Sequence, residues 1–119
     1  MFVKAHTDWS LEETWLSVRR WPNYEVSNNA RVRNAYTGRV LRAQLRGNQG
    51  KKYHCVTLGR VSYKIAELML EAFVEPRPPG RQALHRDDDQ LNDCLTNLYW
   101  GTPQDNALDR EANWIHARS

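Results

Sequence analysis

The spacing of apolar and polar positions predicts several short strands in the first half of the chain. Runs rich in β-branched and aromatic residues lie at residues 24–27, 31–33, 40–41 and 53–58. Turn-forming residues separate these runs, and the pair Asn28-Asn29 is of a kind that tolerates a positive φ. We therefore expect a small antiparallel meander with its arginines on the polar face.

The period of the apolar residues becomes helical from residue 65. Ile65, Leu68, Met69 and Phe73 form one apolar stripe, which is typical of a helix that packs on a core. A segment rich in Pro at residues 74–80 follows directly. Because proline removes a backbone donor and obstructs the preceding turn, this segment ends the helix and marks the clearest joint in the chain.

Beyond the joint, the pattern predicts strand, loop, strand and helix in that order. The two strands are expected at residues 82–86 and 95–100, on either side of a polar loop. Thr102 and Pro103 then suit the cap and the first position of a final helix, which we expect to reach about Trp114. The sequence therefore predicts an α+β fold.

Charge is distributed unevenly along the chain. No Asp or Glu occurs from Val26 to Ala66, although this stretch carries nine of the seventeen basic residues. A basic surface attracts polyanions, because their binding releases counterions. On charge alone, two solvated faces of opposite sign that balance each other are an equal alternative. The candidate DNA-binding residues are Arg31, Arg33, Arg39, Arg42, Arg46, Lys51 and Lys52.

The cysteines and the apolar segments bear on the cellular setting. Cys55 and Cys94 show no paired C-x-x-C spacing, so neither a disulfide framework nor a structural zinc site is indicated. No segment approaches the roughly twenty apolar residues of a membrane helix, and the first residues lack the apolar core of a signal peptide. We expect a soluble protein of a reducing cytoplasm, with no membrane partner.

The segment from Leu84 to Asn106 carries a characteristic arrangement of His and Asn residues. It reads LHRDDDQLNDCLTNLYWGTPQDN, and in the spacing of His85, Asn97 and Asn106 it resembles the HNH motif of the ββα-metal, or His-Me finger, nucleases. These intervals are typical of the phage homing endonucleases in that family. The upstream segment WPNYEVSNNARVRN, with a helix ending in EAF, resembles the NUMOD-type module that often precedes such units.

The two resemblances imply a two-part organisation and a function. A NUMOD-like DNA-binding module is expected at residues 9–75, an HNH ββα-metal unit at 81–114 and a tail at 115–119. The implied fold is a small β-rich module with one helix, followed by the ββα-metal unit. The implied activity is metal-dependent cleavage of DNA, by nicking or double-strand cutting, in a phage-encoded protein acting in the host cell.

The resemblance also assigns a role to each motif residue. His85 is the expected general base, and imidazole suits this work because it titrates near neutrality. Asn97, on the opposite strand, is expected to orient the histidine through a hydrogen bond. Asn106, early in the final helix, is expected to offer its carbonyl oxygen to Mg²⁺ or Mn²⁺, which are hard ions that take oxygen ligands.

Position 84 departs from the family pattern. Family members usually have a metal-binding residue immediately before the general base, and Leu84 cannot bind a metal. Asp87 is the expected replacement, since a continuing strand would place it on the face of His85. Asp88 or Asp89 could instead reach in from the loop, and in a third alternative His85 is itself a ligand.

Two rival functions stay open at this point. The first is a catalytically inactive DNA-binding protein on the same scaffold, with which Leu84 is compatible. The second is a phage adaptor or structural protein, which the acid-free basic run argues against. For an active nuclease of this length we expect loose sequence preference, nicking, or dependence on a phage packaging or replication protein.

Overall fold

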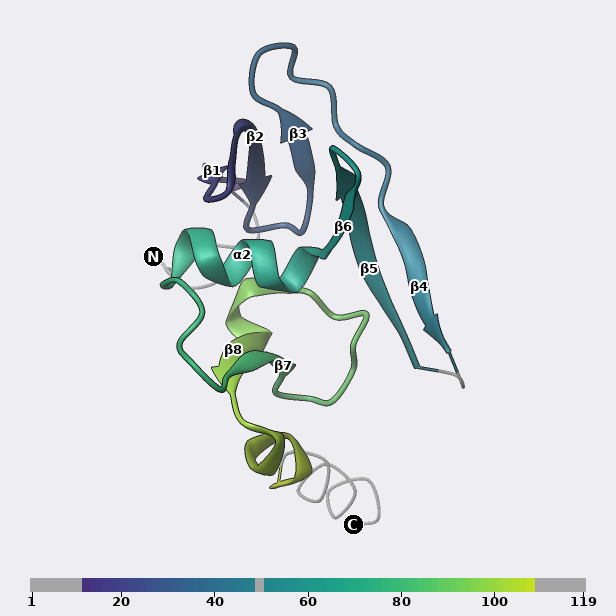
Figure 1. Ribbon diagram of the computed structural model, residues 1–119, viewed down its shortest axis with the longest axis vertical. Helices are drawn as coiled ribbons and strands as arrows, with labels where there is room; N and C mark the ends of the chain where they lie inside the picture. The colour runs from purple at the N-terminus through teal and green to yellow at the C-terminus, as the bar shows by residue number, and fades with distance from the viewer. Residues whose placement is uncertain (1–11, 49–50, 109–119) are drawn as a thin grey trace.

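The computed structural model describes residues 12–48 and 51–108 and is of the α+β class that the sequence predicts (Figure 1). In chain order its elements are β1 (Trp15–Val18), β2 (Trp21–Ser27), β3 (Val32–Asn34), β4 (Gln44–Asn48), β5 (Lys51–Leu58), β6 (Val61–Lys64), helix α2 (Ile65–Phe73), β7 (Gln82–His85), the 3-10 turn η1 (Leu95–Asn97) and β8 (Leu98–Gly101). Residues 103–108 are also helical. Within the two described ranges, no helix is long and apolar enough to cross a bilayer.

The first sheet has the antiparallel order β1-β2-β3. Val18, Val26 and Val32 of this sheet point into the core and are almost fully buried. The turn between β2 and β3 falls at Asn28-Asn29 as predicted, but the positive φ belongs to the next residue, Ala30, at 62°. Asn28 is instead tied to the preceding segment, since its Oδ1 accepts a hydrogen bond of 2.7 Å from the backbone N–H of Thr14.

The second sheet has the antiparallel order β4-β5-β6. The inner end of β5 supplies Val56 and Leu58 to the core. The rest of the β4–β5 hairpin extends away from the helix as a two-stranded ribbon (Figure 1). The predicted strand at residues 40–41 is reduced to one isolated bridge, between Val40 and Arg33.

Helix α2 lies between the first sheet and the β7–β8 pair (Figure 1). Ile65, Leu68 and Met69 of the predicted stripe are almost fully buried, and Phe73 is half-buried against the same core. The burial extends beyond the stripe to neighbouring positions such as Leu70. The helix is covered on more than one face because β-structure packs against it from both sides.

The two predicted modules share one core. Leu98 and Trp100 of β8 belong to the same buried cluster as the valines of the first sheet. Trp100 also contacts the segment that connects the two units, because its Nε1 donates a 3.0 Å hydrogen bond to the backbone oxygen of Glu75. Helix α2 therefore packs against both units and is part of their common core.

The last strand and helix differ in part from the prediction. The expected strand at 95–100 begins three residues later, because residues 95–97 form the turn η1. The final helix begins at Pro103 as predicted, and Thr102 and Asp105 form a reciprocal capping box through their side-chain oxygens and backbone N–H groups. The predicted continuation over 109–114, residues 9–11 and the tail at 115–119 lie outside the described residues.

Candidate active site

His85 lies at the end of β7 and is 9% exposed. Its Nε2 is 2.7 Å from Oδ1 of Asp93, a buried carboxylate in the loop that connects β7 to η1. A ring N–H that donates to this carboxylate fixes the proton on Nε2 and leaves the lone pair on Nδ1. No partner for Nδ1 lies among the described residues, so this nitrogen is available to accept a proton.

Asp93 has a second histidine neighbour. Its Oδ2 is 3.1 Å from Nδ1 of His54, which is on strand β5 and is about a third exposed (33%). The carboxylate therefore bridges two imidazoles that come from different parts of the fold. Each carboxylate oxygen therefore has one hydrogen-bond donor, and a buried carboxylate needs such donors because it has lost its contacts with water.

A polar cavity of about 100 Å³ lies next to His85. Asn106 and Asp88 line this cavity together with His85, His54 and Asp93. The structure therefore brings His85 and Asn106, which are far apart in the motif, to the same small space. The cavity has the size and polarity for a cation or a phosphate oxygen.

A larger cavity of about 620 Å³ borders the same pair of residues, His54 and Asp93. It is mainly apolar and is lined by the turn at residues 28–30 and the loop at 91–96, together with Ala43. Neither His85 nor Asn106 lines it. The groups capable of hydrolytic chemistry are therefore gathered in the smaller cavity.

Asn97 does not form the predicted hydrogen bond to His85. It lies in η1, not on a strand, and its Nδ2 donates to Oδ1 of Asp87 and to the backbone oxygen of Asn92, both at 2.9 Å. Its Oδ1 accepts from the backbone N–H of Asp87 at 3.2 Å, while its own backbone oxygen accepts from the N–H of Arg86 at 2.8 Å. Asn97 thus fixes the backbone that leaves β7, directly after His85.

Asp87 does not reach the cavity. The strand ends at His85, so the expected alternation of faces does not extend to residue 87. Burial raises the pKa of Asp87, but hydrogen bonds from Asn92, the Asp89 backbone and Asn97 outweigh it and hold the pKa below its ordinary value. This carboxylate organises the loop, whereas the cavity is lined by its neighbour Asp88, which adopts a positive φ of 61°.

The donor set around the cavity suits a weakly held cation. Asp88 and Asn106 offer a carboxylate and an amide oxygen, the ligand types that Mg²⁺ and Mn²⁺ accept. Residues 12–48 and 51–108 contain no group of three or more His, Cys, Asp or Glu side chains arranged to hold a metal. Leu84 is buried and packs closely against Gly101, since a Cβ atom built on Gly101 would lie only 2.7 Å from Cδ1 of Leu84. The residues therefore offer two oxygen ligands to a cation, whose other ligands would have to come from outside the described residues.

Known proteins resemble the chain in sequence and in fold. Residues 13–59 match the NUMOD4 motif. Over 97 residues the chain is 27% identical to the uncharacterized HNH endonuclease L245 of Acanthamoeba polyphaga mimivirus, covering 78% of this chain and 28% of that protein. The fold matches the solved structure of the HNH homing endonuclease I-HmuI, which is described as binding and cleaving DNA, with a TM-score of 0.69. The two chains are 24% identical, and the match covers 83% of this chain and 58% of that one. The chain carries a NUMOD4 motif and is similar in sequence to an HNH endonuclease and in fold to an HNH homing endonuclease.

These similarities confirm the resemblance seen in the sequence. The chain spans 28% of the length of the mimivirus protein and 58% of the solved chain. The NUMOD4 match ends at Gly59, in the turn after β5. It includes the first sheet and the β4–β5 hairpin, which carry the basic residues. Helix α2 lies outside the matched motif, although the predicted module extended to residue 75.

Two of the candidate DNA-binding arginines form ion pairs with carboxylates. Arg31 forms hydrogen bonds and an ion pair with Glu13, and Arg33 is paired with Glu25 through Nε at 2.8 Å. Both guanidinium groups also lie over the ring of Trp15, that of Arg33 at 4.0 Å from the ring centroid. These two side chains are integrated into the first sheet.

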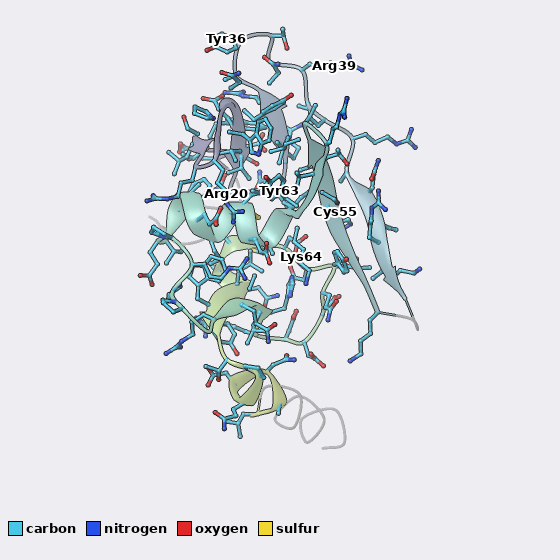
Figure 2. All side chains as sticks on the ribbon, viewed as in Figure 1. Arg20, Tyr36, Arg39, Cys55, Tyr63 and Lys64 are labelled. Carbon is cyan, nitrogen blue, oxygen red and sulfur yellow. The ribbon has the colours of Figure 1, made fainter. Side chains whose placement is uncertain are left out.

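The remaining candidates are exposed and have no carboxylate partner within the described part of the chain. Lys51 and Lys52, on β5, line a hollow of about 230 Å³ together with Asp88 and other residues of the loop at 88–91. This end of the hairpin therefore borders the loop that also lines the His85 cavity. Arg39 is separate from it, because Figure 2 shows this residue beside Tyr36 at the end of the molecule opposite to β7 and β8.

Sequence reasoning missed two residues of this site, His54 and Asp93. His54 lies outside the HNH motif and within the basic run, and Asp93 reads as one more polar residue of the acidic loop. A histidine and a carboxylate are visible in the sequence, but their pairing is not. It depends on how β5 packs beside the loop, which only the tertiary structure shows.

Proposed function

We propose that this chain is a metal-dependent DNA endonuclease in which His85 is the general base. The observation that carries the proposal is the shared cavity: a buried histidine with its Nδ1 lone pair available lies with Asn106 and Asp88 in one small polar space. The exposed basic hairpin borders the same loop. The rival, an inactive DNA-binding protein, is favoured by Leu84 at the usual ligand position.

In the proposed reaction, a water molecule in the cavity transfers a proton to Nδ1 of His85. The oxygen of this water then attacks the phosphorus atom, and the bond from phosphorus to the departing 3′ oxygen breaks. The electron pair of this bond stays on the 3′ oxygen, which takes a proton from solvent. Asp93 stabilises the imidazolium that forms, because its carboxylate already accepts the hydrogen bond from Nε2. A cation held by Asp88 and Asn106, when bound, supplies positive charge near the departing oxygen.

The DNA backbone is proposed to lie along the β4–β5 hairpin. Arg46, Lys51 and Lys52 are exposed there, and the hollow beside the two lysines borders Asp88, which also lines the active-site cavity. A phosphate bound at the hairpin is therefore next to a loop of the catalytic cavity. Arg42 adds an exposed basic side chain before β4, whereas Arg39 lies at the other end of the molecule (Figure 2) and Arg31 and Arg33 contribute less because they are paired.

The first test is His85→Ala. Nicking of supercoiled plasmid should fall by roughly 10²-fold or more, since this is the usual contribution of a general base, while DNA affinity changes by no more than a few fold. Plasmid assays with Mg²⁺ or Mn²⁺, with and without EDTA, provide the measurement. Cleavage by the variant at the wild-type rate would reject the mechanism. A wild-type protein that binds DNA but never cuts it with either ion would support the inactive alternative.

A matched pair of neighbouring carboxylates tests the proposed cation site. Asp88→Asn should raise the Mg²⁺ concentration needed for half-maximal cleavage by roughly 10-fold, because a charged oxygen ligand is lost. Asp87→Asn should lower thermal stability and leave this concentration nearly unchanged, because its carboxylate serves the loop. The reverse result would restore Asp87 as the ligand expected from the sequence.

A further inference from the structure

His54 and Asp93 form a continuous connection between strand β5 and His85. Asp93 accepts from His85 Nε2 at 2.7 Å and from His54 Nδ1 at 3.1 Å. We propose that Asp93 and His54 are positioning residues that couple the orientation of His85 to the seating of the β4–β5 hairpin on DNA. The proposal rests on the proposed nuclease function, in which the hairpin binds DNA and His85 is the base.

The first link is the bond from His85 to Asp93. Both side chains are largely buried, at 9% and 4% exposure, so solvent does not compete strongly for the hydrogen bond. The hydrogen bond made by one ring nitrogen sets the proton position on the other. With Nε2–H directed at Asp93, the lone pair of Nδ1 is held in one direction. Without the carboxylate, the ring loses the hydrogen bond that holds its orientation and keeps the proton exclusively on Nε2.

The second link is the bond from His54 to Asp93. A buried carboxylate oxygen without a hydrogen-bond donor is unfavourable, and His54 supplies this donor for Oδ2. The position of Asp93 therefore depends on where β5 places His54. The side-chain amides of Asn92 and Asn97 do not replace this donor, because the Nδ2 group of each donates to Asp87.

The third link is the hairpin. His54 is paired with Leu45 across the two strands, in the same ladder that pairs Lys52 with Gly47 and Lys51 with Asn48. A phosphate that engages the lysines acts on the strand that carries His54, only a few residues away. A shift of this ladder on DNA therefore reaches Asp93 through His54, and reaches His85 through Asp93.

The kinetic test separates catalysis from binding. Asp93→Ala should lower kcat by roughly 10²-fold, and His54→Ala by roughly 10-fold, with DNA affinity within about 2-fold of wild type. His54→Gln should recover most of the loss, because the amide can donate to Asp93. Glu75→Gln and Thr57→Ala, which alter exposed side chains away from the site, serve as matched controls for charge and for strand β5.

The double variant tests whether the connection is continuous. If His54 acts through Asp93, then adding His54→Ala to Asp93→Ala should cause no further loss of kcat. Losses that multiply in the double variant would overturn the proposed connection. Where Asp93→Ala does not fold, as judged by its circular dichroism melt, Asp93→Asn replaces it, because the amide keeps the shape and one carbonyl acceptor.

A measurement independent of cleavage distinguishes failure of this inference from failure of the nuclease proposal. The ¹⁵N chemical shifts of the His85 ring, recorded at about pH 8, above the ordinary imidazole pKa, should report a proton on Nε2 in wild type and a mixture of tautomers in Asp93→Ala. A short duplex in EDTA should shift these signals in wild type but not in His54→Ala. Signals unchanged by Asp93→Ala, or a duplex effect that persists in His54→Ala, would overturn the inference even if the protein cuts DNA.

Discussion

The β1–β3 sheet and the β4–β5 hairpin both draw on the same acid-free stretch of sequence, yet they use their basic side chains differently. In the sheet, Arg31 and Arg33 are paired with Glu13 and Glu25 and lie over Trp15. In the hairpin, the basic side chains are exposed, and no carboxylate within residues 12–48 or 51–108 pairs with them. The carboxylates of the sheet precede the acid-free stretch in sequence and reach it only through strand pairing and the approach of residues 12–14.

This difference shows that a run of like charges does not by itself define a binding surface. A paired arginine that stacks on an aromatic ring contributes modestly to stability and has already found a negative partner. An exposed basic side chain without such a partner keeps its charge available for a phosphate. We therefore expect the hairpin, rather than the first sheet, to dominate DNA binding.

The largest expected effect comes from neutralising the basic residues of the hairpin and its approach. Replacing Arg42, Arg46, Lys51 and Lys52 by Gln should lower duplex affinity by roughly 10-fold or more at about 0.1 M salt. Each lost phosphate contact should also reduce the slope of log K against log salt by about 0.9. Fluorescence anisotropy at several salt concentrations measures both quantities. An unchanged slope would show that the hairpin faces solvent and does not bind DNA, so that the two regions would not differ in DNA binding.

A smaller effect, on a different quantity, is expected from the first sheet. Arg31→Gln combined with Arg33→Gln should lower the free energy of unfolding by about 1–2 kcal/mol, since two partly exposed ion pairs and two ring contacts are lost. DNA affinity and its salt slope should stay nearly the same. Denaturant melts and the anisotropy series provide the measurement. If the slope fell as it does for the hairpin variant, the contrast between the regions would be wrong.

The smallest expected effect concerns acid. The hydrogen bond from Arg31 lowers the pKa of Glu13, burial opposes this change, and a hydrogen bond from Ser27 adds to it, so the folded pKa lies below the ordinary 4.5. A depressed carboxyl pKa contributes stability that is present above the unfolded value and is lost as pH falls through the folded value. Thermal melts of wild type should therefore decline more steeply below about pH 4.5 than melts of Glu13→Gln. Parallel pH profiles would show that the Glu13–Arg31 pair adds nothing to stability.

The fold was predictable wherever local pattern sufficed. The stripe of α2, the strand around Tyr53 and the Thr102 cap all appear where the periodicity and capping rules place them. Strand β1 was not predicted, because its apolar alternation is short and its pairing with β2 depends on the approach of two segments. The positive φ at Ala30 was also missed, because nearby hydrogen bonds to Ser27 Oγ determine this turn more than the asparagines do.

The sequence predicted some of the residues that line the candidate site, but it did not predict their hydrogen-bond partners. The spacing of the motif identified His85 and Asn106, and both line the same cavity. It also identified Asn97, whose amide bonds to Asp87 in place of His85. The expectation for Asp87 depended on a strand that continued past His85, whereas the chain turns into a loop at that point. Because β7 ends at His85, Asp88 rather than Asp87 lines the cavity.

The sequence by itself determined the α+β class, the order of the motifs and the residue types that the chemistry needs, because these follow from periodicity, capping and spacing over short ranges. Only the tertiary structure decided which charges are neutralised and which groups orient His85. His54 and Asp93 are 39 positions apart in the chain, and their contact at 3.1 Å exists because β5 packs beside the β7–η1 loop. Hydrogen bonds and ion pairs act over a few ångströms of space, so partners that are distant in sequence are known only once the chain is folded.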